Sequence, residues 1–174
     1  MRALLDVVAP EAILLTETNV PHAENVSYFG EGDEAHMVYQ FSLPPLILHA
    51  LLKENARFLT RWASQLESPP PGGTFLNFTA SHDGIGVRPL QGLVPDEEIL
   101  WLAEHARQIG GAVNTKTNED GTESPYELNV TYFSILQDPA DENLSVTRFL
   151  CSQAIAMSMQ GIPALYFNSL CGAR

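Results

Sequence analysis

Four short runs of mostly apolar residues alternate with helical patterns along the chain. The runs cover residues 12–16, 37–42, 74–79 and 164–167. They are apolar on both faces, which is typical of strands that helices cover on both sides. Strand and helix in repeated succession indicate β/α units around a parallel sheet. We therefore expect an α/β fold with four parallel strands.

Three helices are predicted from apolar residues at helical spacing and from their end signals. They cover residues 46–66, about 95–108 and 144–160. Pro44 and Pro45 suit the first turn of the first helix. Three acids after Pro95 suit the positive end of the second helix dipole, and Gly161 ends the third helix.

The stretch between the second and third helices is polar at its start. Residues 114–125 include Lys116, Asp120 and Gly121, a composition that predicts a long exposed loop within one domain. Residues 126–136 are apolar enough to return to the fold.

The length of the chain limits the size of the sheet. An eight-stranded β/α barrel needs about 250 residues, so four strands in 174 residues make about half of one, in a single domain over 1–174. The alternative is a small open doubly wound sheet. Such a sheet usually carries a glycine-rich phosphate turn after its first strand, and Gly84-Ile85-Gly86 lacks the third glycine of that motif.

Charge and hydropathy argue against nucleic-acid partners, membrane binding and secretion. The formal net charge is −12, and the nine basic residues are scattered, so neither nucleic acid nor an anionic membrane is an expected partner. No apolar run approaches the roughly 20 residues that span a bilayer. Asp6 interrupts the only N-terminal apolar run, so a signal peptide is not predicted and we expect a cytoplasmic protein. Cys151 lies in an apolar helical stretch, which predicts a free, buried thiol.

Two carboxylates follow predicted strands directly. Glu17 comes after the first strand, and Asp83, preceded by His82, comes after the third. Active sites of β/α folds lie beyond the carboxyl ends of the strands. Two carboxylates and an imidazole from different strand ends fit acid/base chemistry on a glycosidic bond. The alternatives are structural, with Glu17 accepting loop N–H groups and Asp83 forming an Asp-Gly turn.

Other polar and aromatic residues also lie near strand ends. They either line a sugar pocket or serve packing and loop hydrogen bonds: His22, Tyr28, His36, Tyr39 and Gln40. Arg88 either meets an anion or is solvated. A bound metal has less support, because no third ligand is visible beside His82 and Asp83. A metal-dependent hydrolase that uses His22 with these two residues remains an alternative.

Two of these segments together resemble glycoside hydrolase family 13, the α-amylase family. Residues 14–19, Leu-Leu-Thr-Glu-Thr-Asn, resemble its fifth-strand motif, whose Glu is the general acid/base. Residues 78–83, Phe-Thr-Ala-Ser-His-Asp, resemble its seventh-strand motif. Residues 40–45, 84–89 and 161–167 are similar to the sucrose phosphorylase branch, and residues 17–22 look closer to the glucosylglycerate phosphorylases.

The resemblance implies a retaining glucosyl transfer from an α-glucoside to inorganic phosphate, with no further cofactor. It makes Glu17 the acid/base, Asp83 the transition-state stabiliser and His82 a ligand of the glucosyl unit. It also suggests substrate contacts for Gln40, Arg88, Tyr126 and Glu127, with Arg88 facing an anionic acceptor. Residues 123–127 replace the loop with which sucrose phosphorylases hold phosphate or fructose, so sucrose is not the expected substrate.

One part of the family's machinery is missing from the sequence. The resemblance places the nucleophilic Asp, two residues after an Arg, on the fourth strand, and no Arg-x-Asp occurs in the 174 residues. The chain thus looks like strands 5–8 of the barrel and is expected to be inactive alone. A half-barrel has two open sheet edges, which predicts self-association or a missing N-terminal half-barrel as partner. The alternative is a non-catalytic sugar-binding or assembly module derived from the same barrel.

Overall fold

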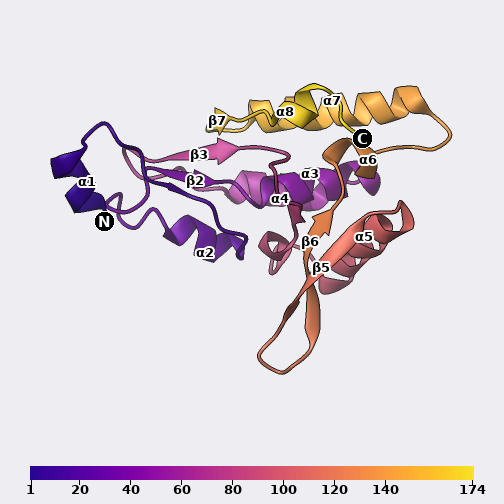
Figure 1. The fold of residues 1–174 in the computed structure, drawn as a ribbon, viewed down its shortest axis with the longest axis horizontal. Helices are drawn as coiled ribbons and strands as arrows, with labels where there is room; N and C mark the ends of the chain where they lie inside the picture. Colours follow the sequence, from indigo (N-terminus) through magenta and orange to yellow (C-terminus); the bar gives the residue numbers. More distant parts are fainter.

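Four parallel strands form the centre of the structure. A computed structural model covering residues 1–174 pairs β1 (Leu15–Thr16), β2 (Met37–Tyr39), β3 (Thr74–Asn77) and β7 (Ile162–Pro163) in that order. In register, Thr16 lies opposite Val38, Val38 opposite Phe75, and Leu76 opposite Ile162. The order of the strands in space is their order in the chain, as repeated β/α units require (Figure 1).

The last strand differs from its prediction. Residues 164–167 were expected to form it, but β7 lies earlier, at Ile162–Pro163. The Ala164 N–H still donates to the Asn77 carbonyl, and the chain then turns into the short helix α8 (Phe167–Leu170). The N–H of Leu170 bonds back to the carbonyl of Tyr166, so a helical turn competes successfully with a longer strand.

The helices lie between and beside these strands. The predicted helices at 95–108 and 144–160 are confirmed as α5 (Asp96–Gln108) and α7 (Glu142–Ser158). The Asp141 side chain caps α7 by accepting the Leu144 N–H at 3.0 Å. Short helical segments complete the chain: α1 (Arg2–Val8), α2 (His22–Ser27), α6 (Tyr132–Ile135) and the 3₁₀ turn η1 (Arg88–Leu90).

The predicted helix over 46–66 is wrong as a single element. It is divided into α3 (Leu43–Leu52) and α4 (Arg57–Gln65). The break occurs at Glu54, whose φ of +52° lies in the left-handed region. The Asn55 N–H then donates to the Ala50 carbonyl at 3.0 Å, which is the bond that closes a Schellman motif. Glycine is usual at this position, and its absence hid the helix end in the sequence.

The polar stretch at 114–125, predicted as a loop, is part of a β-hairpin. β5 (Ala112–Thr117) pairs antiparallel with β6 (Glu123–Asn129), and β6 also pairs with β4 (Ile85–Gly86). Cross-strand polar contacts hold it, such as the 2.9 Å bond from Thr115 Oγ1 to Glu123 Oε2. The hairpin projects away from the parallel sheet (Figure 1). Because the hairpin is mostly exposed and polar, its sequence lacks the alternation of apolar and polar residues from which strands are predicted.

The hydrophobic core surrounds α3. All α3 residues from 43 to 50 are buried, and five of them belong to a hydrophobic cluster shared with α4, α5, α6 and α7: Leu43, Leu46, Ile47, Leu48 and Ala50. A second cluster of Phe29, Ala35, Val38 and Phe75 lies against the sheet. Cys151 is exposed on α7, so the prediction of a buried thiol is wrong. None of the helices combines the length and apolar character that a membrane crossing requires.

Candidate active site

Glu17 lies at the carboxyl end of β1. The strand ends at Thr16, and the chain continues as a loop through Pro21 to α2. β1 is held by pairing with β2 and by the Leu14 N–H, which donates to His36 Nδ1 at 2.9 Å. The Glu17 side chain is exposed, so the carboxylate is free to meet a ligand.

His82 and Asp83 lie on the segment that follows β3. The Asp83 N–H donates to Ser81 Oγ at 3.2 Å, which tightens the turn before β4. His82 Nε2 lies 3.6 Å from Asp83 Oδ1, with exposed fractions of 75% and 54% for the two side chains. A protonated His82 therefore forms an ion pair with its neighbour, and both groups face solvent.

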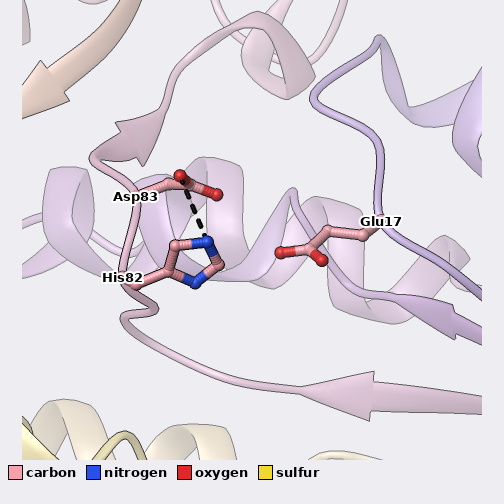
Figure 2. Close-up of side chains that lie close together, drawn as sticks. All are labelled: Glu17, His82 and Asp83. Atoms are coloured by element: carbon pink, nitrogen blue, oxygen red, sulfur yellow. Dashed lines mark ion pairs between the residues drawn. The ribbon is translucent and has the colours of Figure 1, made fainter.

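The fold brings Glu17 to this pair although more than sixty residues separate them. One ligand atom from each of Glu17, His82 and Asp83 lies within 4.8 Å of the others. Figure 2 shows the Glu17 carboxylate pointing across a gap toward the His82 ring, with the Asp83 carboxylate above that ring in the view. Two carboxylates and an imidazole at this spacing can share protons with one ligand, and their oxygen and nitrogen atoms also suit a divalent cation.

A cluster of aromatic side chains includes Tyr39, which is close enough to Glu17 and Asp83 to feel their charge. The rings of Tyr39, Phe41 and Phe78 contact one another with centroids 5.1–5.7 Å apart. Burial raises the pKa of Tyr39, and the negative charges of Glu17 and Asp83 raise it further. The contacts of Phe41 and Phe78 with Tyr39 were not predicted, although both residues lie near the ends of predicted strands.

Asn19 connects the Glu17 loop to the hairpin. Its Nδ2 donates to the Tyr126 carbonyl at 3.0 Å, and Arg88 Nη1 donates to the Asn19 carbonyl at 3.4 Å. The Asn19 side chain packs directly against Gly86, since a Cβ at that position would be only 2.6 Å from Asn19 Oδ1. Arg88 and Tyr126, both predicted site residues, therefore contact the loop that carries Glu17.

Glu127 lies close to the Asp83 turn. A Cβ added to Gly84 would be 2.6 Å from Glu127 Cγ, so this side chain packs directly on the residue after Asp83. Asn114 Nδ2 donates to Glu127 Oε2 at 3.4 Å. The hairpin thus adds a third carboxylate at the border of the site.

Two sequence predictions, a substrate contact for Gln40 and a metal site that includes His22, differ from what the structure shows. Gln40 is 1% exposed, and both of its amide atoms lack a hydrogen-bond partner, so it presents no surface to a ligand in this structure. His22 Nδ1 lies 3.2 Å from Ser42 Oγ and its ring packs edge-on against Trp62. Burial lowers the pKa of His22. The acidic cluster contains Glu17 instead of His22, so the set of His22, His82 and Asp83 is not formed.

A cleft of about 330 Å³ opens on the Asp83 side of the cluster. It is bounded by the turn at 80–85, by residues 129–133 and by the C-terminal segment around Tyr166 and Asn168. Glu17 does not line it. The surface around the carboxylates is therefore open on the Glu17 side and hollowed on the Asp83 side.

Comparison with known proteins gives relatives over nearly the whole chain. Glucosylglycerate phosphorylase of Escherichia coli is 52% identical over 100% of the chain, and that of Allomeiothermus silvanus is 49% identical over 99%. Sucrose phosphorylase of Streptococcus mutans is 32% identical over 94%. The chain spans about a third of the length of each of these relatives: 32%, 32% and 33%. No protein-family profile matches the chain.

A solved structure confirms the fold. Sucrose 6F-phosphate phosphorylase from Thermoanaerobacter thermosaccharolyticum superposes with a TM-score of 0.75 at 24% identity, over 92% of this chain and 31% of that one. Together with the parallel sheet of four consecutive strands, this supports the predicted fold class, the second half of an α/β barrel. The predicted resemblance to the glucosylglycerate and sucrose phosphorylases is likewise confirmed.

Proposed function

We propose that this chain, a homologue of about a third of the glucosylglycerate and sucrose phosphorylases, carries the acid/base half of a retaining α-glucoside phosphorylase site. The substrate is a glucosylglycerate-like α-glucoside, and phosphate accepts the glucosyl unit. The observation that carries the proposal is the convergence of Glu17 with His82 and Asp83, from two strand ends, within 4.8 Å.

The three residues divide the chemistry between them. Glu17 protonates the leaving oxygen of the glucoside and later takes the proton of the incoming phosphate. Asp83 stabilises the positive charge that develops on the sugar ring, because its carboxylate lies beside the place where that charge forms. His82, 3.6 Å from Asp83, donates a hydrogen bond to a sugar hydroxyl.

The hairpin supplies the acceptor side of the site. Tyr126 and Glu127 on β6 border the carboxylate cluster through their contacts with Asn19 and Gly84. Arg88 is a cation that contacts the Glu17 loop, because its Nη1 donates to the Asn19 carbonyl. An anionic acceptor such as glycerate or phosphate is attracted to this guanidinium.

The nucleophile comes from outside these 174 residues. The resemblance gives Asp83 another role and assigns the nucleophile to an Asp two residues after an Arg, and the sequence holds no Arg-x-Asp. The chain alone therefore turns over no glucoside. Activity requires the additional segments that the threefold longer relatives contain.

A chimera tests the proposal. The segment of E. coli glucosylglycerate phosphorylase that matches this chain is replaced by the chain itself, and phosphorolysis of glucosylglycerate is measured. We expect an active chimera whose kcat falls roughly 10²–10⁴-fold in Glu17→Gln, because general acid catalysis is lost. Asp83→Asn is expected to lower kcat with little change in binding of the ground state.

The outcome also separates the catalytic proposal from a sugar-binding module. Glu119→Gln, an exposed hairpin change far along the chain from the cluster, serves as the matched control and should leave kcat unchanged. A folded chimera that binds glucose 1-phosphate but is equally inactive with and without Glu17 would contradict the catalytic role and favour the binding module.

A further inference from the structure

The loop that carries Glu17 is held by side chains more than by its own backbone. β1 ends at Thr16, and the backbone–backbone hydrogen bonds outside the helices and strands include none to or from residues 17–20. A carboxyl that must meet the leaving oxygen of a substrate needs neighbours that fix its position. The side-chain contacts of this loop therefore decide where Glu17 lies.

Two residues of the loop use side chains to reach other parts of the chain. Thr18 Oγ1 donates to Asn25 Oδ1 at 3.3 Å, but Asn25 lies only seven residues further on, in α2. Asn19 Nδ2 donates to the Tyr126 carbonyl on β6 at 3.0 Å, across 107 residues of chain. The Asn19 amide is thus the side-chain group that ties the Glu17 loop to the hairpin.

The surroundings of Asn19 fix the orientation of its amide. Its Oδ1 is buried without a hydrogen-bond partner and lies against Gly86. A rotation of the amide by half a turn would place this oxygen opposite the Tyr126 carbonyl oxygen, where two acceptors repel each other, so Nδ2 faces the hairpin. From another side, Arg88 Nη1 donates to the Asn19 carbonyl at 3.4 Å. Asn19 is therefore held by η1, β4 and β6, two residues after Glu17.

We propose that Asn19 is a positioning residue for Glu17, and that through its amide the hairpin sets the place of the acid/base carboxyl. This role rests on the proposed function, which makes Glu17 the acid/base. Asn19 acts through the loop and touches no reacting atom. Because its amide donates to a backbone carbonyl, the position of β6 is transmitted to Glu17 whatever side chain follows that carbonyl. The acceptor side of the site and its proton donor thus move together.

Two reactions of the E. coli chimera distinguish the positioning of Glu17 from a general structural role. Phosphorolysis of glucosylglycerate needs Glu17 to protonate the leaving oxygen and to take the proton of phosphate. With α-glucosyl fluoride and azide, fluoride leaves with the bonding electrons and without a proton, and azide, which carries no proton, forms the new bond to the sugar. Glu17→Gln should therefore slow the first reaction and spare the second.

Asn19→Ala should reproduce this difference between the two reactions in weaker form. We expect kcat for glucosylglycerate to fall roughly 10–10²-fold with KM nearly unchanged, and the fluoride reaction to change by less than about threefold, because a displaced carboxyl retains part of its acid function. Gly86→Ala displaces the same side chain without removing it and should give the same result. Gly86 has no positive φ, so alanine adds no backbone strain there.

Asn118→Ala is the matched control for Asn19→Ala. It removes an amide hydrogen bond of the same length, 3.0 Å to Thr122 Oγ1, that stays within the hairpin, and it should leave both reactions unchanged. Equal losses in both reactions of Asn19→Ala, or no loss in either, would overturn the positioning role while Glu17→Gln still distinguishes them. If Glu17→Gln itself slowed both reactions equally, the acid/base assignment and with it the proposed function would be rejected.

A measurement on the isolated chain tests the same contact without activity. NMR relaxation should give backbone order parameters of about 0.85 for residues 17–20 in the unmutated chain and below about 0.6 in Asn19→Ala. Asn118→Ala should leave these values unchanged. Equal order in Asn19→Ala and the unmutated chain would show that the amide does not hold the loop, and would overturn the positioning role whether or not the chimera is active.

Discussion

Gly86 is fixed by the side chain that packs on it. Asn19 Oδ1 and Cγ would lie 2.6 and 2.7 Å from a Cβ at this position, closer than non-bonded atoms approach. Gly86→Ala therefore displaces Asn19 and breaks its 3.0 Å bond to the Tyr126 carbonyl. We expect a loss of about 1–2 kcal/mol in the free energy of unfolding, measured by urea titration.

A double-mutant cycle identifies the cause of that loss. Asn19→Ala removes the side chain that clashes, so Gly86→Ala should cost less in the Asn19→Ala background than alone. Additive effects of the two changes would mean that Gly86 is required for its backbone conformation and not for the contact with Asn19.

The candidate site was only partly predictable at the scale of single residues. Glu17, His82 and Asp83 could be predicted because the carboxyl ends of parallel strands meet at one edge of the sheet, whatever the intervening chain does. Gln40 follows a strand in the same way, yet it is buried. Whether a strand-end side chain faces solvent or the interior depends on packing that the sequence does not display.

At the scale of the elements, the break between α3 and α4 at Glu54 has a testable cost in the free energy of unfolding. A non-glycine residue at φ +52° is strained by its Cβ, and glycine relieves that strain. We expect Glu54→Gly to raise the free energy of unfolding by up to about 1 kcal/mol, as measured by urea titration. Glu54→Ala keeps the strain and also loses the exposed 3.5 Å ion pair with Arg148, so it should not stabilise the chain.

A polar contact between α3 and α5 makes stability depend on pH. Glu98 Oε2 lies 2.9 Å from His49 Nε2 and 3.1 Å from Lys53 Nζ. The bond to His49 lowers the pKa of Glu98 below its ordinary value of 4.5, and Lys53 lowers it further. The stabilisation is therefore present above pH 4.5 and is lost as the pH falls through the lower folded-state value.

Glu98→Gln should remove this dependence. We expect a loss of about 1 kcal/mol at pH 7 and a smaller difference from the unmutated chain at pH 3, measured as urea midpoints. Glu97→Gln, on the exposed neighbour, is the control and should follow the unmutated chain at both pH values. An equal loss at pH 7 and pH 3 would refute the role of the Glu98 charge.

Elements with a buried face were predicted better than elements without one. α5 and α7 follow their apolar period, and three of the four strands start or end near their expected positions. The β5–β6 hairpin is mostly exposed, so no apolar alternation reveals it, and its stability comes from pairing and polar contacts. The division of the helix at 46–66 escaped prediction because a glutamate occupies the glycine position.

At the scale of the whole molecule, the exposed apolar side chains near the two ends of the chain should bind an apolar dye. The isolated chain is expected to enhance the fluorescence of anilinonaphthalene sulfonate while still unfolding in a single transition. Phe167→Ser removes a 71% exposed ring from a helix with no buried residue, so it should reduce the fluorescence without lowering the unfolding midpoint. Dye binding that increases in this variant would indicate loosened packing instead.

The same substitution at a buried phenylalanine serves as the control for Phe167→Ser. Phe149 on α7 is 7% exposed and packs against Phe133 with ring centroids 5.2 Å apart. Phe149→Ser should lower stability by roughly 3–5 kcal/mol and increase dye binding, because it opens the core. If both substitutions gave the same result, the exposed ends would not be the site of the dye.

The sequential order of the strands also sets an order of folding. β1, β2 and β3 lie beside one another within the first half of the chain, so they can pair as soon as a ribosome has released them. β7 pairs with β3 only after α5, the hairpin and α7 have been synthesised, and this distant contact is expected to form last. During translation the growing edge of the sheet would thus stay at β3, open to a chaperone, until the C-terminal strand arrives.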